Sequence, residues 1–225
     1  MNNSKNALKG LIGIGSYILS LVIFFVPLLF IKTNSLTFKI IYSLIQDIVQ
    51  LSILVLIFKR ELKNNLKDLK KNYKSYFKKY FKYWFLIIGI MMVSNYIILT
   101  FFNGTTASNQ QAINNSFNKA PIYTFISAVF FAPILEELVF RLSIRKIFKN
   151  KYLFIFISGF LFGGLHVFIS MTSPLELLYL IPYCTPGFIF AYLLYKTDNI
   201  FVPAFIHFFH NGLLLSIQML AMVLS

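Results

Sequence analysis

Residues 121–148 read PIYTFISAVFFAPILEELVFRLSIRKIF, a long apolar run that carries charged side chains in its middle. Pro121 opens the run, and proline is favoured in the first turn of a helix. A membrane-spanning helix needs about 20 mainly apolar residues. The stretch therefore predicts a helix that crosses a membrane from Pro121 to Phe140 and continues through Arg141 to about Phe148.

Six other apolar runs of similar length predict six further membrane spans. They lie at about Leu11–Ile31, Leu36–Phe58, Trp84–Phe102, Tyr152–Ser170, Leu175–Tyr195 and Ile200–Val223. The first run exceeds the core of a signal peptide and lacks a small-residue cleavage site, which indicates a retained helix. Pro182 and Pro186 predict a bend or break in the sixth of the seven spans.

The composition is typical of an integral membrane protein. Of the 225 residues, 58% are hydrophobic and 12% are charged, whereas soluble domains are roughly half apolar and a quarter charged. The single cysteine, Cys184, excludes an intramolecular disulfide. We predict an all-α fold, a polytopic membrane helix bundle forming one domain over residues 1–225. The N-terminal spans occupy residues 11–102, and the polar segment Asn103–Ala120 separates them from the rest.

The net charge of +14 is concentrated in blocks between the apolar runs, so nucleic-acid binding is not expected. Residues 59–83 form the largest block, with ten basic residues and an apolar stripe at Leu62, Leu66, Leu69 and Tyr73. This combination predicts a basic interfacial helix attracted to the anionic headgroups of membrane lipids.

The distribution of charge also predicts an orientation. If the basic block lies inside, 18 of the 21 basic residues lie inside, and only Lys32, Lys39 and Lys119 lie outside. The positive-inside rule then predicts a multi-pass protein of the cell membrane with a cytoplasmic N-terminus. A composition rich in Lys, Asn, Ile and Phe favours a bacterial source.

Ionisable groups within membrane spans are costly, at about 2.5–3.5 kcal/mol for Arg, Lys or Asp on insertion scales. Here most of the ionisable residues within the spans lie in three of them, and one neutral polar residue, Asn211, lies with them. The set comprises Glu136, Glu137, Arg141, His166, His207, His210 and Asn211. A rise of about 1.5 Å per helical residue puts the three groups at comparable depths, which predicts one shared site. Asp47 is an isolated case that we interpret as a buried polar tie.

Spacing along each helix suggests what these side chains do. Glu137 and Arg141 are four residues apart, where a carboxylate and a guanidinium pair on one helix face. Glu136 is turned by about 100° from Glu137, so the two carboxylates are expected to serve different directions. Glu136 then suits a general base for water. His207 and Asn211 are also four apart and suit an oxyanion site.

His166 is expected to orient the water or accept a proton. A single histidine in an apolar helix is more often a packing residue, and His210 is interpreted as structural or supporting.

Three motifs in this order resemble a known family. EELVFR at 136–141 matches E-E-x-x-x-R, FGGLH at 162–166 matches F-x-x-x-H, and NIFVPAFIHFFHN at 199–211 ends in H-x-x-x-N. They are similar to the CAAX protease and bacteriocin-processing (CPBP) family of intramembrane endopeptidases, which includes the type II CAAX prenyl endopeptidase. The resemblance covers about residues 121–215.

The resemblance implies a hydrolase, a protease that cleaves a peptide or membrane-protein substrate, with defined roles for the motif residues. Glu136 and His166 would activate the attacking water, and His207 and Asn211 would form the oxyanion site. Glu137 and Arg141 would support the constellation. One departure is that the sixth span carries Gly187 and Ala191 where relatives often have two glycines.

Metal dependence is open at this point. Family names often include metalloendopeptidase, and Glu136, His166 and His207 are residue types that hold zinc. The sequence lacks the H-E-x-x-H pattern of the common zinc proteases, so hydrolysis without a cofactor is favoured and zinc is the alternative.

Two other functions compete with proteolysis. One is a non-catalytic membrane protein for binding or bacteriocin immunity. The other is a proton-coupled transporter, which is disfavoured because the sequence shows no internal repeat. The substrate and the oligomeric state cannot be predicted from these residues.

Overall fold

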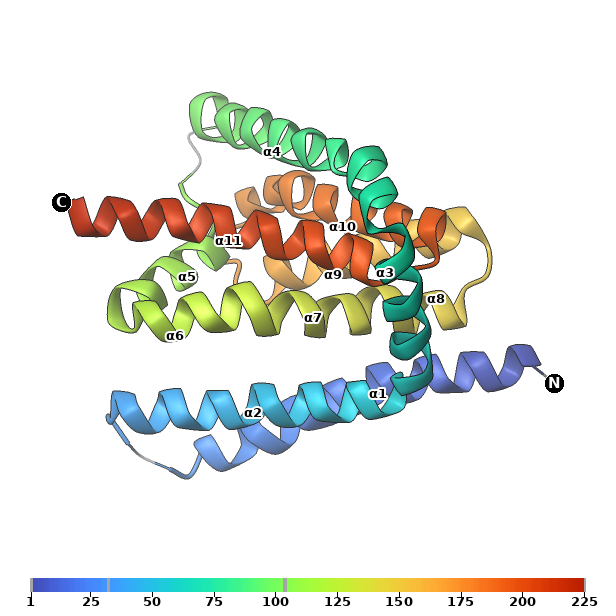
Figure 1. The fold of residues 1–225 in the computed structure, drawn as a ribbon. Coiled ribbons are helices and arrows are strands. Elements are labelled where there is room, and N and C mark those ends of the chain that lie inside the picture. Colours follow the sequence, from blue (N-terminus) through green and yellow to red (C-terminus); the bar gives the residue numbers. More distant parts are fainter. Residues whose placement is uncertain (1, 32, 103–104, 225) are drawn as a thin grey trace.

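The computed structural model describes residues 2–31, 33–102 and 105–224 (Figure 1). In this part of the chain, seven helical segments are long and apolar enough to cross a membrane, and no β-strand is present. The predicted all-α polytopic bundle is confirmed, and the chain is a multi-pass membrane protein. Lys32 and Asn103, which the sequence assigned to connections, lie outside the described residues.

The N-terminal half contains four long helices and one shorter helix. They are α1 (Asn2–Leu28), α2 (Leu36–Ile57), α3 (Lys59–Tyr80), α4 (Lys82–Phe101) and α5 (Ser108–Lys119).

The C-terminal half contains the three spans that carry the motifs and a fourth span between the last two of them. The first span is built from α6 (Pro121–Ile126), the π-helical η1 (Ser127–Phe131), α7 (Ala132–Glu136), the π-helical η2 (Glu137–Ser143) and α8 (Ile144–Ile147). The others are α9 (Lys151–Phe168), the 3-10 helix η3 (Pro174–Tyr179) with α10 (Leu180–Thr197), and α11 (Phe201–Leu224).

Two elements differ from the expected pattern in the N-terminal half. The first helix begins at Asn2, nine residues before the apolar run, because residues that precede a membrane core continue a helix without being apolar. The polar connection contains α5, which has no periodic apolar face in the sequence. This helix is held by tertiary contact, since Phe117 is completely buried and packs with Val129 and Leu215.

The predicted break near Pro182 and Pro186 was wrong in its position. The irregular part is the 3-10 turn η3, and α10 continues without a break from Leu180 to Thr197. Pro182 falls in the first turn of α10, where a helix does not need the missing N–H group.

Close contact between α9 and α10 forms the tightest part of the bundle. A Cβ atom at Gly187 would lie 2.6 Å from the carbonyl oxygen of Gly159. A Cβ atom at Gly163 would lie 2.5 Å from the backbone nitrogen of Cys184. Small residues allow membrane helices to approach in this way, and here they bring the backbone of α10 against the helix that carries His166.

The basic segments gather at one end of the bundle. The N-terminal end of α1, the turn after α8 and the connection between α10 and α11 lie there, and α3 crosses this end (Figure 1). Glu61 of α3 joins two of these elements, with carboxylate oxygens 2.6 Å from Nζ of Lys9 and 2.9 Å from Nζ of Lys146. Burial raises the pKa of Glu61, but the bonds from these two lysines outweigh it and hold the pKa below its ordinary value.

Side chains of α3 also form a clasp, a set of hydrogen bonds with the connection between α10 and α11. Asn65 donates to the Asp198 carbonyl at 3.2 Å and accepts from the Ile200 amide at 2.9 Å. Asn199 donates to the Asn65 carbonyl at 2.8 Å and to the Asp68 carboxylate at 2.7 Å. The start of α11, and with it the position of His207, is therefore fixed by α3.

Asp68 is the charged member of this clasp. The Tyr76 hydroxyl, at 2.6 Å, and the Asn199 amide donate to its carboxylate and hold the pKa of Asp68 below its ordinary value. Burial and the bond to Asp68 raise the pKa of Tyr76 to about 12. Within the clasp, the bond from Asn199 is thus made to an ionised Asp68.

Candidate active site

The span with the two adjacent glutamates has wide π-helical turns on both sides of α7. Pro133 lacks an N–H group and cannot bond to the carbonyl one turn earlier, and η1 ends directly before this region. The second wide turn, η2, begins at Glu137, and within it the Ser143 hydroxyl donates to the Leu138 carbonyl at 2.9 Å. Turns of this kind are frequent at functional sites, and here Glu136 is the last residue of α7, directly before the second wide turn.

The predicted pairing of Glu137 with Arg141 is present. Oε2 of Glu137 lies 3.4 Å from Nε of Arg141, and the two side chains are only 1% and 0% exposed. The guanidinium lies over the Phe162 ring, 4.1 Å from its centroid, and 5.3 Å from the centroid of Phe190. The charge is thus balanced by one carboxylate and two aromatic faces.

His207 of α11 contacts both glutamates. Its Nε2 lies 3.5 Å from Oε2 of Glu136, and its Nδ1 lies 3.1 Å from Oε1 of Glu137. The two carboxylates thus contact opposite nitrogens of this ring, and of the two only Glu137 also pairs with Arg141 among the described residues. Both glutamates have right-handed helical backbone dihedrals, and the expectation that they serve different directions stays a prediction.

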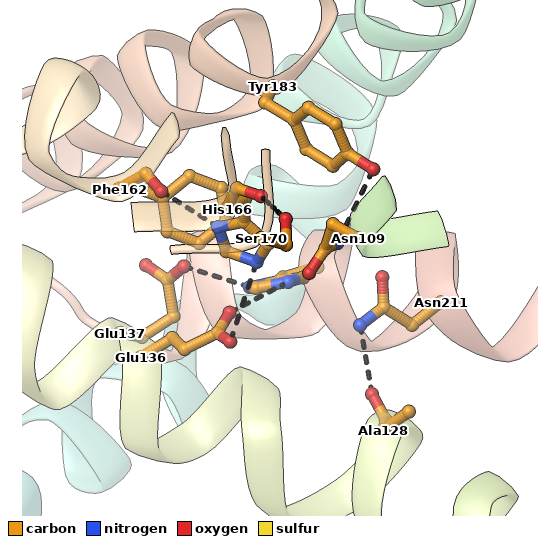
Figure 2. A network of polar contacts seen from close by, with 10 residues as sticks. Asn109, Ala128, Glu136, Glu137, Phe162, His166, Ser170, Tyr183 and Asn211 are labelled. Carbon is orange, nitrogen blue, oxygen red and sulfur yellow. Dashed lines mark hydrogen bonds and ion pairs between the residues drawn. The ribbon is translucent and has the colours of Figure 1, made fainter. Parts of the chain in front are cut away.

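His166 of α9 approaches Glu136 from another side. Its Nε2 lies 3.9 Å from Oε1 of Glu136, and its Nδ1 lies 2.7 Å from the Phe162 carbonyl oxygen. A carbonyl only accepts hydrogen bonds, so the Nδ1 atom carries a proton. When the ring is neutral, the lone pair of Nε2 then faces the Glu136 carboxylate. Both imidazoles thus approach this carboxylate, and Figure 2 shows His166 beside Glu136.

Glu136 and His166 are the accessible members of the cluster. Their side chains are 19% and 21% exposed, whereas His207 is 5% exposed. The two contacts to Glu136, at 3.5 and 3.9 Å, are longer than direct hydrogen bonds.

Asn211 lies one helical turn after His207, beside the cluster in Figure 2. Its side-chain amide donates to the Ala128 carbonyl at 2.9 Å. Among the described residues, no hydrogen bond or ion pair joins it to Glu136, His166 or His207. A primary amide has two N–H groups, so this bond leaves a second donor.

The remaining polar residues of the spans lie apart from this contact network. His210 is buried, and among the described residues its Nδ1 has no hydrogen-bond partner. Asp47 of α2 accepts a hydrogen bond from the Ser127 hydroxyl at 2.9 Å, in keeping with a polar tie between helices.

Three side chains at the site were not expected from the sequence. The Phe190 ring stacks on His207 at 4.9 Å between centroids, and the Tyr183 ring stacks on His166 at 5.5 Å. Asn109 of α5 donates to the Tyr183 hydroxyl at 3.3 Å. Phenylalanine and tyrosine are too frequent in this chain, with 27 and 13 copies, to be singled out. Asn109 lies in a segment without an apolar pattern.

The zinc alternative rests on Glu136, His166 and His207. Zinc ligands from imidazole and carboxylate lie about 2.0–2.2 Å from one ion. Among the described residues, no group of three or more His, Cys, Asp or Glu side chains is arranged to hold a metal ion. We derive no step through a metal, and hydrolysis without a cofactor stays a prediction.

Fold and site together define a polytopic membrane protein with an acid and two histidines brought together from three spans. A family model described as "Type II CAAX prenyl endopeptidase Rce1-like" matches residues 118–213. The resemblance predicted from the three motifs is therefore confirmed over somewhat less than half of the chain.

Two curated relatives each match about half of the chain. "Putative membrane peptidase YdiL" of Bacillus subtilis is 33% identical over 119 residues, which are 52% of this chain and 45% of the relative. "UPF0177 protein YvdC" of Lactococcus lactis is 31% identical over 107 residues, or 47% of this chain and 39% of the relative. The chain spans less than half the length of both relatives. No solved structure matches it.

Proposed function

We propose that the protein is an intramembrane endopeptidase that hydrolyses a peptide bond with water activated by Glu136 and His166. The observation that carries the proposal is the convergence on the Glu136 carboxylate of two imidazoles from two other spans, at 3.5 and 3.9 Å. The family match over residues 118–213 and the relative named as a membrane peptidase support it. The substrate is proposed to be a peptide or a membrane protein.

In the first step, a water between Glu136 and His166 attacks the carbonyl carbon of the scissile bond. A proton passes from the water to the Glu136 carboxylate, and the carbonyl oxygen becomes an oxyanion. The neutral His166 donates a hydrogen bond from Nδ1–H to the Phe162 carbonyl. At Nε2 it accepts a hydrogen bond from the water. This arrangement holds the water for attack.

In the second step, the tetrahedral intermediate breaks down. Nε2–H of His207 and the second N–H of Asn211 stabilise the oxyanion. In this role His207 carries protons on both ring nitrogens throughout the step, and the Glu137 carboxylate at 3.1 Å from Nδ1 balances its charge. Glu136 returns its proton to the leaving nitrogen, the C–N bond breaks, and a carboxylic acid and an amine are released.

The experiment compares membranes from cells that carry wild-type protein or the Glu136→Gln variant. New peptide termini that occur with the wild type and disappear with the variant are expected, measured by mass spectrometry of labelled N-termini. Asp47→Asn is the matched control, because it removes a second intramembrane carboxylate that lies outside the cluster.

If Glu136→Gln leaves all termini and the cellular phenotype unchanged, the endopeptidase proposal fails and a non-catalytic immunity protein is favoured. Proton flux in proteoliposomes that depends on Glu136 would instead favour a transporter. Activity of the purified protein is expected to survive a zinc chelator, and its loss, with recovery on adding zinc, would contradict metal-independent hydrolysis.

We also propose that α3 lies on the cytoplasmic leaflet and binds anionic lipid headgroups through its lysines. Its apolar stripe supports this placement, since Tyr73 and Phe77 are each 54% exposed on a helix rich in lysine. In a Cys184→Ser background, Lys71→Cys should react with an impermeant thiol reagent only from inside, and Lys119→Cys only from outside. The opposite result would reverse the proposed orientation.

A further inference from the structure

The ring of His166 is packed on more than one side. Tyr183 of α10 lies nearly parallel to it, with 5.5 Å between ring centroids and 17° between the planes. The Phe162 ring lies 4.6 Å away at 48°. Figure 2 shows the Tyr183 ring near His166, with its hydroxyl directed to Asn109.

One hydrogen bond alone does not fix an imidazole. The imidazole can turn about its Cβ–Cγ bond, and this rotation breaks the bond from Nδ1 to the Phe162 carbonyl. A flat ring packed parallel to the imidazole blocks this motion. The direction of Nε2 toward Glu136 therefore depends on the position of the Tyr183 ring.

The Tyr183 ring is in turn held by α5. The side-chain amide of Asn109 donates to the Tyr183 hydroxyl at 3.3 Å. The preceding residue, Ser108, anchors the start of α5 to η3, because its backbone N–H and its hydroxyl donate to the Glu176 carboxylate at 2.9 and 2.8 Å. Glu176 also accepts from the backbone N–H of Thr172 at 2.9 Å.

We propose that Tyr183 is a positioning residue that, anchored by Asn109, sets the orientation of His166 toward Glu136. The helix α5, outside the matched motifs, thus contributes to the site. The inference deepens the proposed function, because a misplaced His166 would no longer hold the attacking water.

The test uses the full-length protein in nanodiscs, labelled with 15N in its three histidines. The His166 resonances are assigned with a His166→Gln variant. Nitrogen chemical shifts then report which ring nitrogen carries the proton, without any need for catalytic activity. Wild-type protein is compared with Tyr183→Leu, Tyr183→Phe and Asn109→Ala. Tyr192→Leu is the matched control, since Tyr192 is on the same helix and its hydroxyl lies 3.4 Å from that of Tyr83.

Wild-type His166 is expected to show a single tautomer with the proton on Nδ1. Tyr183→Leu should give shifts averaged between the two tautomers, and Asn109→Ala should move them in the same direction. Tyr183→Phe should move the shifts as Asn109→Ala does and by less than Tyr183→Leu, because it keeps the ring and loses only the bond to Asn109. Tyr192→Leu should keep the wild-type shifts. In a cleavage assay, Tyr183→Leu should lower kcat about two- to tenfold with KM unchanged, a range that corresponds to one aromatic pair, and Tyr183→Phe should lower it less.

Unchanged His166 shifts in both Tyr183→Leu and Asn109→Ala would overturn the inference. So would a Tyr183→Phe variant that behaves like Tyr183→Leu, because the hydroxyl rather than the ring would then matter. If Tyr183→Leu does not fold, Asn109→Ala alone decides the outcome. A protein without peptidase activity would defeat the proposed function, while the histidine shifts would still decide the role of Tyr183.

Discussion

Replacement of Arg141 by methionine removes the positive member of a completely buried ion pair. The partner Glu137 is 1% exposed, so its carboxylate would remain out of water without a counter-charge. Breaking a buried pair in this way costs about 3–5 kcal/mol. The contacts of the guanidinium with Phe162 and Phe190 are lost as well, which places the expected cost in the upper part of that range.

The double variant Glu137→Gln/Arg141→Met should be more stable than Arg141→Met alone. Among the described residues, the guanidinium nitrogens have no hydrogen-bond partner, so removing both charges leaves few bonds unmade. Glutamine keeps an oxygen that can accept from His207. We expect the double variant to recover about 2 kcal/mol or more, as buried pairs are often replaced by neutral groups at small cost.

Unfolding in mixed micelles, followed by the fluorescence of Trp84, measures these differences. The control is Arg145→Met, because Arg145 is one turn further on and donates only to the carbonyls of Phe148 and Lys149. This control should change the free energy of unfolding by about 1 kcal/mol or less. The reasoning is refuted if Arg141→Met is as mild as the control, or if the double variant is no more stable than the single one.

Three further predictions follow from the site and its supports. Asn211→Ala should lower kcat about 10²- to 10³-fold in the cleavage assay, the usual loss for an oxyanion donor, and a wild-type rate would remove it from that role. Gly187→Leu should prevent accumulation in membranes, measured by immunoblot, because its Cβ would meet the Gly159 carbonyl at 2.6 Å, whereas Gly89→Leu should accumulate, since a Cβ there meets nothing within 4 Å. Because the pKa of Asp68 is lowered by folding, its contribution to stability is present above about pH 4 and is lost as the pH falls through the lower folded value. Asp68→Asn should therefore reduce the loss of stability between pH 7 and pH 3 in unfolding experiments, and an unchanged pH dependence would contradict this.

The spans could be predicted because their lengths and compositions are set by the bilayer. The pairing of Glu137 with Arg141 could be predicted because it lies within one helix. The contact of His207 with both glutamates could not, since it depends on how α11 packs against α7. Local sequence does not show how helices far apart along the chain pack.

Residues that hold the site from outside the motifs were also beyond prediction. Asn109 and Tyr183 meet across 74 positions, and neither stands out by type or spacing. The same holds for Asn65, whose bonds to the α10–α11 connection are visible only once α3 crosses the end of the bundle. Long-range polar pairs of this kind are set by packing of the whole chain.

The clasp of α3 on the α10–α11 connection has a consequence for biogenesis. Its bonds join residues more than 130 positions apart, so the last span cannot settle until the amino-terminal spans are already inserted. A fragment starting at residue 118 would contain every motif residue and still lack the partner that sets the height of His207. Co-expression of the two halves as separate polypeptides, rather than the motif-bearing half alone, is what would rebuild the site.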